Sequence, residues 1–423
     1  MNTRTESVFR PRPWINFFPC HPKKMSIVIV GAGIAGLSLA EGLLNRGNSV
    51  IVLERYPNVG GRIVTHRDPQ YEIGAGRIHA SHKRVHALIK RFKLHTYPIS
   101  DKVVYRPLET TKDEAHGLDW ILPAILRMLE GQDPKTLASH TLSSLLSPEW
   151  RTLMTRFPYW AEVHMLRADL ALESFQAEMG SYGGYVGIQE GIDALTSHLL
   201  ASVEKKADVR VRHRVNDIRQ RGGQYVITGD YGKKAEAKPF RIQADQVIIA
   251  TCRCSLSKFA VLKGLPLLKQ LQTSGLTRIY ASYPVSPKGP WWSGMEKTVS
   301  DSPLRFVIPI NPKTGLIMIS YTDGTDTNTW KDLEGAKLSK AIQKEVKRLF
   351  PERAVEEPTF LEKHEWPSGC TYWVPGDYDV DKAIQKAMHP QEGLWVVGES
   401  VARHQAWIES ALKSVEDFFK MFA

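Results

Sequence analysis

The sequence predicts an α/β protein in which a domain built on a parallel sheet is interrupted by a second, α+β domain with a mixed sheet. Near the start, apolar β-branched residues at 25–31 predict a buried strand, residues 34–46 have helical spacing, and residues 49–54 form a second apolar run. Near the other end, a short apolar run at 393–398 stops at a glycine, and a helical pattern follows at 406–422. These predicted strands and helices lie near the two ends of the chain, with the second domain between them in sequence. We therefore expect one sheet assembled from segments that are far apart in the chain.

The middle of the chain alternates between helical and strand-like patterns. Helical spacing is found at residues 81–93, 118–180 (with four interrupting prolines), 188–204 and 336–350. Strand-like patterns are found at residues 209–218, 224–229, 240–250, 276–285 and 304–321. We assign residues 25–99, 185–255 and 386–423 to the parallel-sheet domain, and residues 100–184 and 256–385 to the second domain.

Composition excludes several classes of protein. With 423 residues, 42% hydrophobic and 24% charged, the chain is not disordered as a whole, collagen-like or a small disulfide scaffold. Four cysteines make a reducing compartment the default, which favours a cytoplasmic location. No run of about 18 apolar residues is present, so we expect no membrane-spanning helix.

The net charge of +11 comes partly from residues 1–24, which have five basic residues, one acidic residue and four prolines. This segment predicts a basic, poorly ordered leader without the apolar stretch of a secretory signal, and organelle targeting stays open. Arg210, Arg212 and Arg214 alternate along one predicted strand, but without interleaved aromatic residues they indicate an exposed face and not nucleic-acid binding. A homodimer also stays open.

A glycine motif follows the first predicted strand. Gly31, Gly33 and Gly36 have the spacing that lets a turn close tightly, a pyrophosphate approach the backbone, and a helix pack closely on a strand. Glu54 ends the second strand, where a carboxylate can accept hydrogen bonds from ribose hydroxyls. A glycine-rich turn alone is a weak signal, but the strand–turn–helix–strand context predicts a Rossmann-like, dinucleotide-binding domain.

Further motifs carry a resemblance to a known family. Glu54 and Arg55 are followed by Gly60-Gly61-Arg62, then by Gly74-Ala75-Gly76-Arg77, and near the end by Gly398-Glu399 and Trp407-Ile408. In this combination the chain resembles the flavin-dependent amine oxidases, which include monoamine, polyamine and L-amino-acid oxidases and histone lysine demethylases. The resemblance covers both ends of the chain and, more loosely, residues 183–220 and 245–285. It implies a GR2-type FAD-binding domain and FAD as the cofactor in place of NAD.

The same resemblance implies a set of cofactor-binding residues. Gly60, Gly61 and Arg62 would line the phosphate and flavin, although Arg62 could instead form a surface salt bridge. Glu399 would bind the ribityl chain or the pyrophosphate, and Val215 the adenine edge through its backbone. The full set of expected cofactor-binding residues is Gly31, Gly33, Ile34, Ala35, Gly36, Glu54, Arg55, Gly60, Gly61, Arg62, Gly74, Ala75, Gly76, Arg77, Val215, Gly398, Glu399, Trp407 and Ile408.

The implied reaction takes an amine to an imine, which yields an aldehyde or ketone plus ammonia or an amine, while O2 becomes hydrogen peroxide. The substrate would be a polyamine, an aromatic amine or an amino acid. Trp407 would flank the amine, with Tyr372 or Trp373 as the opposite wall, and the alternative for Trp407 is core packing. A flavin-bearing scaffold with little turnover, or an enzyme acting on a non-amine substrate, are the competing interpretations.

Two arginines bear on this reaction. Arg278 stands where most of the family has a lysine that holds a water against the flavin, and a permanently charged guanidinium is no proton shuttle. This departure puts turnover in doubt. Arg77 resembles the arginine that pairs with the substrate carboxylate in L-amino-acid oxidases, and its alternative is a pairing within the flavin domain.

The remaining cysteines and histidines favour plainer interpretations. Cys370 lies in a segment that resembles the one carrying the covalent flavin of monoamine oxidases, but it falls two residues late, so we expect non-covalent FAD and a buried thiol. His79, His82 and His86 could share a helical face, yet no further ligand is evident and we predict no metal. Cys252 and Cys254 are separated by one residue, so we expect neither a redox nor a zinc motif.

Overall fold

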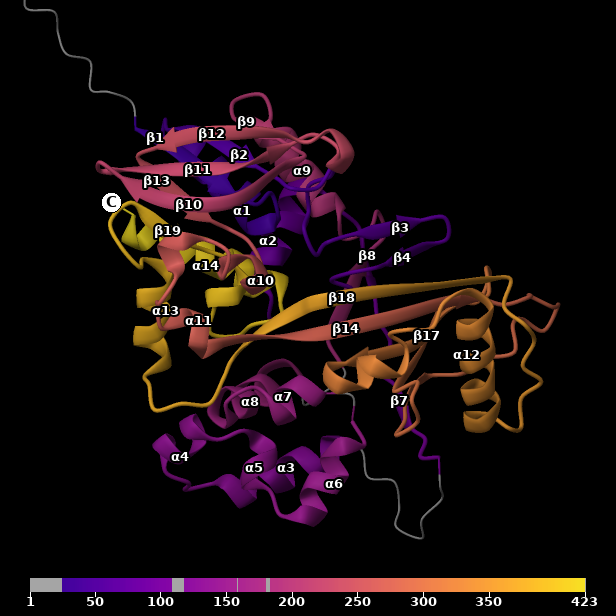
Figure 1. The fold of residues 1–423 in the computed structure, drawn as a ribbon. Coiled ribbons are helices and arrows are strands. Elements are labelled where there is room, and N and C mark those ends of the chain that lie inside the picture. Colours follow the sequence, from indigo (N-terminus) through magenta and orange to yellow (C-terminus); the bar gives the residue numbers. More distant parts are fainter. Residues whose placement is uncertain (1–24, 109–117, 158, 180–182, 423) are drawn as a thin grey trace, which may run out of the picture.

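A computed structural model describes residues 25–108, 118–157, 159–179 and 183–422. The predicted leader at residues 1–24 lies outside these ranges. The parallel sheet is present: five strands from four separated segments align in the order β19-β13-β1-β2-β9. They are β1 (Ser26–Val30), β2 (Ser49–Leu53), β9 (Asp208–Arg210), β13 (Gln246–Ile249) and β19 (Leu394–Val396). This order confirms the Rossmann-like half of the predicted fold (Figure 1).

Four helices lie beside this sheet. They are α1 (Ile34–Leu44), α2 (Lys83–Phe92), α9 (Ala194–Val203) and α14 (Ile408–Met421). α1 packs on β1 and β2 and contacts both α9 and α14, and α2 packs on α9 and α14. Gly36 makes the fit of α1 possible, since a Cβ there would lie 1.9 Å from the carbonyl oxygen of Gly31.

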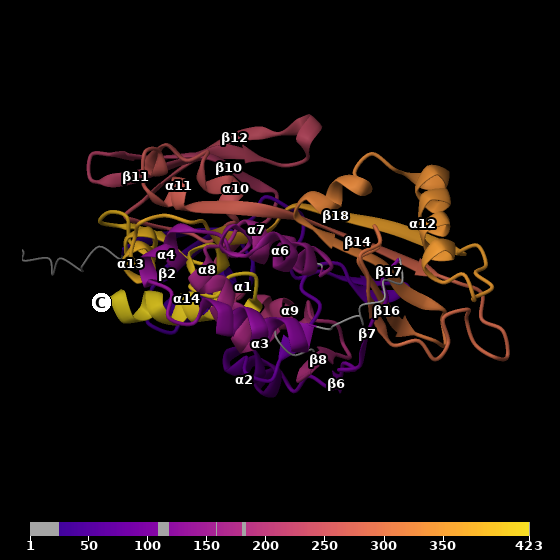
Figure 2. The ribbon, with the colours of Figure 1, turned by 90° about the horizontal axis from the view of Figure 1, so that it is seen from below.

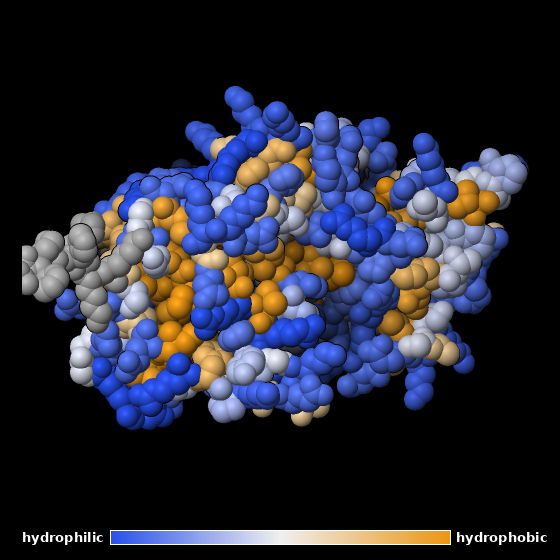
Figure 3. Space-filling view, turned by 90° about the horizontal axis from the view of Figure 1, so that it is seen from above, coloured by the Kyte–Doolittle hydropathy of each residue, from blue (hydrophilic) through white to orange (hydrophobic). Residues whose placement is uncertain are grey.

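Small antiparallel elements extend this part of the molecule. A three-stranded sheet follows the parallel strands, namely β10 (His213–Arg221), β11 (Gln224–Tyr231) and β12 (Lys238–Ala244). Two smaller sheets are β3 (Thr65–Arg67) with β4 (Gln70–Glu72), and β5 (Ile78–His79), β8 (Tyr185–Ile188) and β6 (Thr96–Pro98). Polar side chains cover most of the face at the top of Figure 1, with apolar side chains between them (Figure 3).

The second part of the fold is a six-stranded mixed sheet in the order β18-β14-β17-β16-β15-β7. Its strands are β7 (Val103–Tyr105), β14 (Leu271–Ser282), β15 (Lys297–Val299), β16 (Phe306–Asn311), β17 (Leu316–Asp323) and β18 (Phe360–Trp373). Helix α12 (Gly335–Leu349) packs its apolar face on this sheet. β14 and β18 are long neighbours that run from the parallel-sheet side to the side of α12 (Figures 1 and 2).

Short helices close the molecule on one side of these sheets (Figure 2). They are α3 (Leu118–Leu129), α4 (Pro134–Ser139), α5 (Leu142–Leu145), α6 (Pro148–Thr155), α7 (Trp160–His164), α8 (Ala168–Ser174) and a π-helix (Phe175–Met179). Elsewhere lie α10 (Arg253–Leu256), α11 (Leu267–Gln270), α13 (Val380–Met388) and 3-10 turns at 234–236, 260–262, 324–329 and 399–401. None of the described helices has the length and hydropathy needed to cross a membrane.

Several predicted elements were wrong in extent. The predicted helix at 188–204 begins only at Ala194, because β8 continues to Ile188 and Gly191 turns the chain at φ +90°. The predicted strands at 240–250 and 304–321 are each two strands; at 304–321 Gly315 lies in the turn between them at φ +69°. The predicted strand at 209–218 is also broken, since Arg212 has φ +56° between β9 and β10. The predicted domain boundaries stay a prediction.

Candidate active site

The turn after β1 is shaped for a phosphate-bearing ligand. Gly31 has φ +109°, and a Cβ there would lie 2.5 Å from the carbonyl oxygen of Ala250. α1 begins directly afterwards with no side chain capping its first N–H groups. Free N–H groups at the N-terminus of a helix attract anions, which suits a pyrophosphate.

Glu54 braces this turn from the end of β2. Its carboxylate accepts hydrogen bonds from the backbone N–H of Ala32 and of Tyr56, both at 2.9 Å. The side chain is 5% exposed, and burial raises its pKa. Glu54 therefore joins the end of β2 to the glycine turn after β1. It lies where the sequence predicts a carboxylate that binds the ribose of the nucleotide.

A cavity of about 650 Å³ opens from this turn toward the six-stranded sheet. Every predicted cofactor residue except Gly36 lines it, and so do Arg278 and Tyr372. Gly36 instead packs α1 against the turn. Residues from both ends of the chain and from its middle thus share one cavity, whose volume is typical of small-molecule and cofactor sites.

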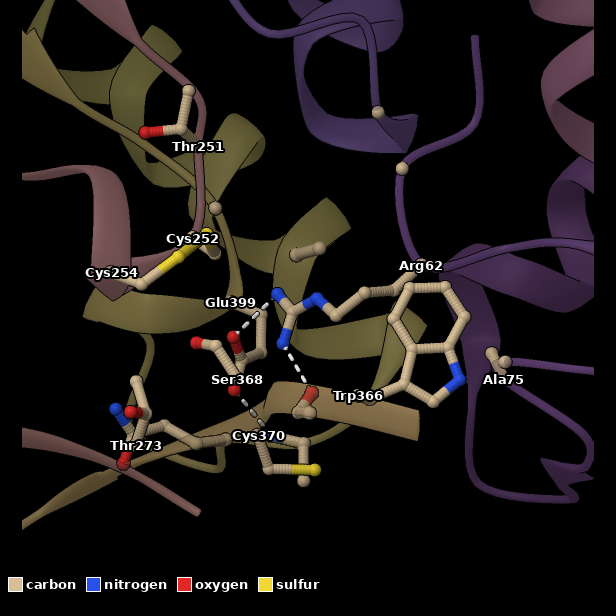
Figure 4. Close-up of a pocket in the computed structure, with 18 of the residues that line it drawn as sticks. Arg62, Ala75, Thr251, Cys252, Cys254, Thr273, Trp366, Ser368, Cys370 and Glu399 are labelled. Atoms are coloured by element: carbon tan, nitrogen blue, oxygen red, sulfur yellow. Dashed lines mark hydrogen bonds and ion pairs between the residues drawn. A yellow bond between two sulfur atoms is a disulfide. The ribbon is translucent and has the colours of Figure 1, made fainter. Parts of the chain in front are cut away.

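Arg62 crosses the cavity wall to Glu399 (Figure 4). Its guanidinium donates to Oε2 of Glu399 and to the carbonyl of Gly369, each at 2.7 Å. The other carboxylate oxygen of Glu399 accepts from the N–H of Thr371 and of Ala406, both at 3.0 Å. Because Glu399 is only 5% exposed, this is not the surface salt bridge considered as the alternative for Arg62.

The cavity wall fits a polar cofactor. The hydroxyls of Thr251 and Ser368 line it, and neither finds a hydrogen-bond partner among the described residues although both atoms are buried. Buried polar atoms normally have partners, and a bound dinucleotide would supply them. Figure 4 shows Trp366 and Ala75 on one side of the Arg62–Glu399 pair and Cys252–Cys254 on the other.

Arg278 contacts the glycine turn at residues 74–76, which is part of the expected cofactor-binding set. Its Nη1 donates to the carbonyls of Glu72, at 3.1 Å, and of Gly74. A Cβ on Gly76 would be 3.1 Å from the same nitrogen. The guanidinium therefore braces the 74–76 turn through this one nitrogen.

Aromatic side chains form the walls beyond this turn. The guanidinium carbon of Arg77 lies 4.4 Å from the ring centre of Tyr185 and 5.4 Å from that of Trp407. Tyr372 lines the cavity, and its hydroxyl donates to Oε1 of Glu162 at 3.0 Å. Trp373 is fully buried in the core, so of the two residues considered for the opposite wall it is Tyr372 that faces the cavity.

Sequence reasoning missed a pair of carboxylates, Glu162 and Asp323. Both line the cavity, and Glu162 is 7% exposed. Asp323 accepts from the backbone N–H of Trp160, at 3.2 Å, and of Ala161, at 3.1 Å. Burial, together with the neighbouring charge of Glu162, raises the pKa of Asp323 well above its usual range. The one signal in the sequence was an acidic residue inside an otherwise apolar stretch. Trp366 on β18 also lines the cavity and was missed.

The cysteine and histidine interpretations had mixed outcomes. Cys370 is free and lines the cavity, and burial raises its pKa to about 12. His82 packs edge-on against Trp407 at 5.0 Å, and the described part of the chain contains no cluster that could bind a metal.

Cys252 and Cys254 form a disulfide, a bond that was not anticipated from the sequence, and the expectation of neither a redox nor a zinc motif stays a prediction. Spacing excluded a two-residue redox motif, but a Cα–Cα distance of 5.4 Å lets the two sulfurs bond directly. The prediction that Arg210, Arg212 and Arg214 alternate along one strand was wrong. Arg210 lies on β9 and pairs with Asp208, whereas Arg214 lies on β10 and lines the cavity.

A Rossmann-like domain whose glycine turn opens into a cavity with aromatic walls defines a flavoprotein oxidoreductase. The sequence matches the flavin containing amine oxidoreductase family over residues 34–415. It is similar to an L-amino-acid oxidase of Crotalus adamanteus (23% identity, 93% of this chain, 86% of the relative) and to one of Vipera ammodytes ammodytes (24%, 92% and 90%). A solved putrescine oxidase triple mutant has a TM-score of 0.73 at 16% identity, covering 94% of this chain and 99% of that one.

The chain belongs to the flavin containing amine oxidoreductase family. It is an FAD-dependent enzyme of amine oxidation, which converts an amine to an imine. This outcome confirms the family, cofactor and reaction class predicted from the sequence.

Proposed function

We propose that the preferred substrate is a small amine that carries a second positive charge, such as a diamine. The observation that carries this proposal is the pair of carboxylates Glu162 and Asp323 on the cavity wall. Within the described residues, neither forms an ion pair with a lysine, arginine or histidine. Burial raises the pKa of both carboxyls although the charge of Arg77 acts to lower that of Glu162, so a bound cation would favour their ionised form.

The chain's own side chains would orient such a substrate. Bound FAD supplies the chemistry by accepting a hydride equivalent from the carbon next to nitrogen. Trp407 and Tyr372 offer aromatic walls for the reacting amine and exclude water from it. The hydroxyl of Tyr372 donates to Glu162, which fixes the carboxylate and the ring in one arrangement. The second ammonium of the substrate would then bind at the carboxylate pair.

Glu162→Gln tests this arrangement. The substitution keeps the shape and an acceptor for Tyr372 but removes a carboxyl that a bound cation would hold in its ionised form, so kcat/KM for a diamine should fall about tenfold. A monoamine of the same chain length should be unaffected. Oxygen consumption measures both substrates. Glu392→Gln, at an exposed position, is the matched control. Equal losses for diamine and monoamine would contradict the proposal.

The pH dependence gives a second readout of the same variant. A protonated carboxyl cannot neutralise a cation, so kcat/KM for the diamine should rise with pH as Asp323, whose pKa is raised by burial and by Glu162, loses its proton. Because Glu162 helps to raise that pKa, Glu162→Gln should move the rise to lower pH. Identical profiles for the two proteins would count against a coupled pair.

A second candidate substrate is an L-amino acid bound through Arg77. Its guanidinium lines the cavity beside Tyr185 and Trp407, and among the described residues it forms no ion pair with a carboxylate. A substrate carboxylate would provide one. The similarity to L-amino-acid oxidases supports this candidate.

Arg77→Lys separates the two candidates. Lysine keeps the charge but loses the bidentate fork, so the KM for L-amino acids should rise while the KM for amines stays the same. Equal effects on both classes would remove the amino-acid candidate. Anaerobic mixing with diamines, monoamines and L-amino acids, followed by the flavin absorbance, ranks the classes directly. Bleaching by none of them would contradict both candidates.

We also propose that FAD is bound without a covalent bond to Cys370. Burial raises the pKa of this thiol to about 12, so it stays protonated and is a poor nucleophile. Acid precipitation should therefore release the flavin into the supernatant, and Cys370→Ser should retain FAD as the wild type does. Yellow precipitate from the wild type but not from Cys370→Ser would show a covalent link.

A further inference from the structure

We infer that Cys252 and Cys254 form a peroxide-sensitive thiol–disulfide site on the wall of the cofactor cavity, and that its redox state controls how firmly FAD is retained. Both residues line the cavity and are bonded to each other. Cys254 is exposed and Cys252 is partly buried, so an oxidant or a reductant can reach the pair from solvent. The third cysteine of the cavity, Cys370, is free.

The position of the pair connects it to the phosphate-binding turn. Ala250 and Thr251 come directly before Cys252, and the N–H of Ala250 donates to the carbonyl of Val30 at 2.8 Å. These are the residues that close on Gly31: a Cβ at that glycine would lie 2.5 Å from the Ala250 carbonyl oxygen and 3.2 Å from Cγ2 of Thr251. A bond between residues 252 and 254 therefore restrains the backbone that packs against the dinucleotide turn.

The residue between the two cysteines connects them to the other half of the fold. Arg253 donates to the carbonyl of Leu271, the first residue of β14, at 3.0 Å, and to the carbonyl of Leu268. β14 also bears Arg278, which braces the 74–76 turn. Figure 4 shows the disulfide across the cavity from Trp366 and Ala75. The pair thus lies at the junction of the parallel sheet with the sheet of the second half.

The enzyme's own product can oxidise this site. The exposed Cys254 sulfur attacks hydrogen peroxide, the O–O bond breaks, and one water leaves with a sulfenic acid formed on Cys254. The Cys252 sulfur then attacks that sulfur, the S–S bond forms, the S–O bond breaks and a second water leaves. Two thiols and one peroxide give one disulfide and two waters. An exposed cysteine beside a resolving cysteine is the arrangement found in redox sensors.

Thiol mapping tests whether the bond forms. The FAD-loaded protein is reduced, freed of reductant, treated with hydrogen peroxide, alkylated and digested with trypsin. Trypsin cleaves after Arg253, so a bond between the two cysteines joins peptides that would otherwise separate. We expect that joined pair after peroxide and two alkylated cysteines before it. Two alkylated cysteines after peroxide would overturn the inference. Because peroxide is added, this result does not depend on turnover, and an inactive protein that forms the bond would contradict only the proposed function.

FAD release tests the consequence. After dilution, fluorescence of the freed flavin should rise several-fold faster from the reduced protein than from the oxidised one. Cys252→Ser should release FAD at the fast rate whether or not peroxide is present, while Cys370→Ser, the matched control from the same cavity, should still respond to peroxide. Equal rates of FAD release from the reduced and the oxidised wild type would show that the disulfide does not control FAD retention. This comparison needs no variant.

Discussion

Gly31→Ala should yield a folded protein that is purified without flavin. The new Cβ would lie 2.5 Å from the Ala250 carbonyl oxygen, at a backbone φ of +109° that alanine avoids. Both the strain and the contact fall on the turn that approaches the pyrophosphate. A cost of about 3 kcal/mol would weaken FAD binding roughly 100-fold. The ratio of flavin to protein absorbance, and titration with added FAD, measure the loss.

Gly47→Ala is the matched control for Gly31→Ala. Gly47 also has a positive φ, +79°, but a Cβ there meets nothing within 4 Å. In this variant the alanine has an unfavourable positive φ but makes no contact at the dinucleotide turn, so the protein should keep its flavin. If both variants lose FAD to the same extent, backbone strain alone explains the effect. If Gly31→Ala retains FAD at the wild-type ratio, the turn does not bind the pyrophosphate.

The sequence was sufficient for those parts of the site that are contiguous in the chain. The strand, glycine turn and helix around Gly31 are neighbours in sequence, so local spacing predicts both their structure and their ligand. The same holds for Gly60-Gly61-Arg62 and for Gly398-Glu399, although the contact of Arg62 with Glu399 joins residues 337 positions apart. Spacing could place each residue in the site but could not show that the two form an ion pair.

The carboxylate pair could not be predicted in this way. Glu162 is in the short helix α7 and Asp323 ends β17, and only the packing of that helix on the six-stranded sheet brings them together. β18 was missed for a local reason, because its sequence mixes charged residues with Pro367 and Gly369 and lacks the apolar alternation of a strand. Its contribution to the cavity, Trp366 and Tyr372, follows from its pairing with β14.

Arg278→Met should lower kcat about 100-fold while the protein stays folded. Methionine fills similar space but donates no hydrogen bonds, so the carbonyls of Glu72 and Gly74 lose their charged partner. The turn at 74–76, which lines the cavity, would then lose its support. Steady-state kinetics give the fall in kcat, and the flavin content separates poor turnover from poor retention.

Arg278→Lys decides what the arginine does. If its role is to brace the turn, lysine should restore only part of the activity lost in Arg278→Met, because a compact ammonium cannot also stack a planar group on the ring of Tyr321 as the guanidinium does. Full activity, or activity above the wild type, would instead mean that a lysine here acts as the family's lysine does and that arginine lowers the activity of the natural enzyme. The structure favours the first outcome, since the guanidinium already donates to two backbone carbonyls and lies 5.0 Å from the ring centre of Tyr321. We therefore expect arginine at this position to support the 74–76 turn through its contacts with the carbonyls of Glu72 and Gly74.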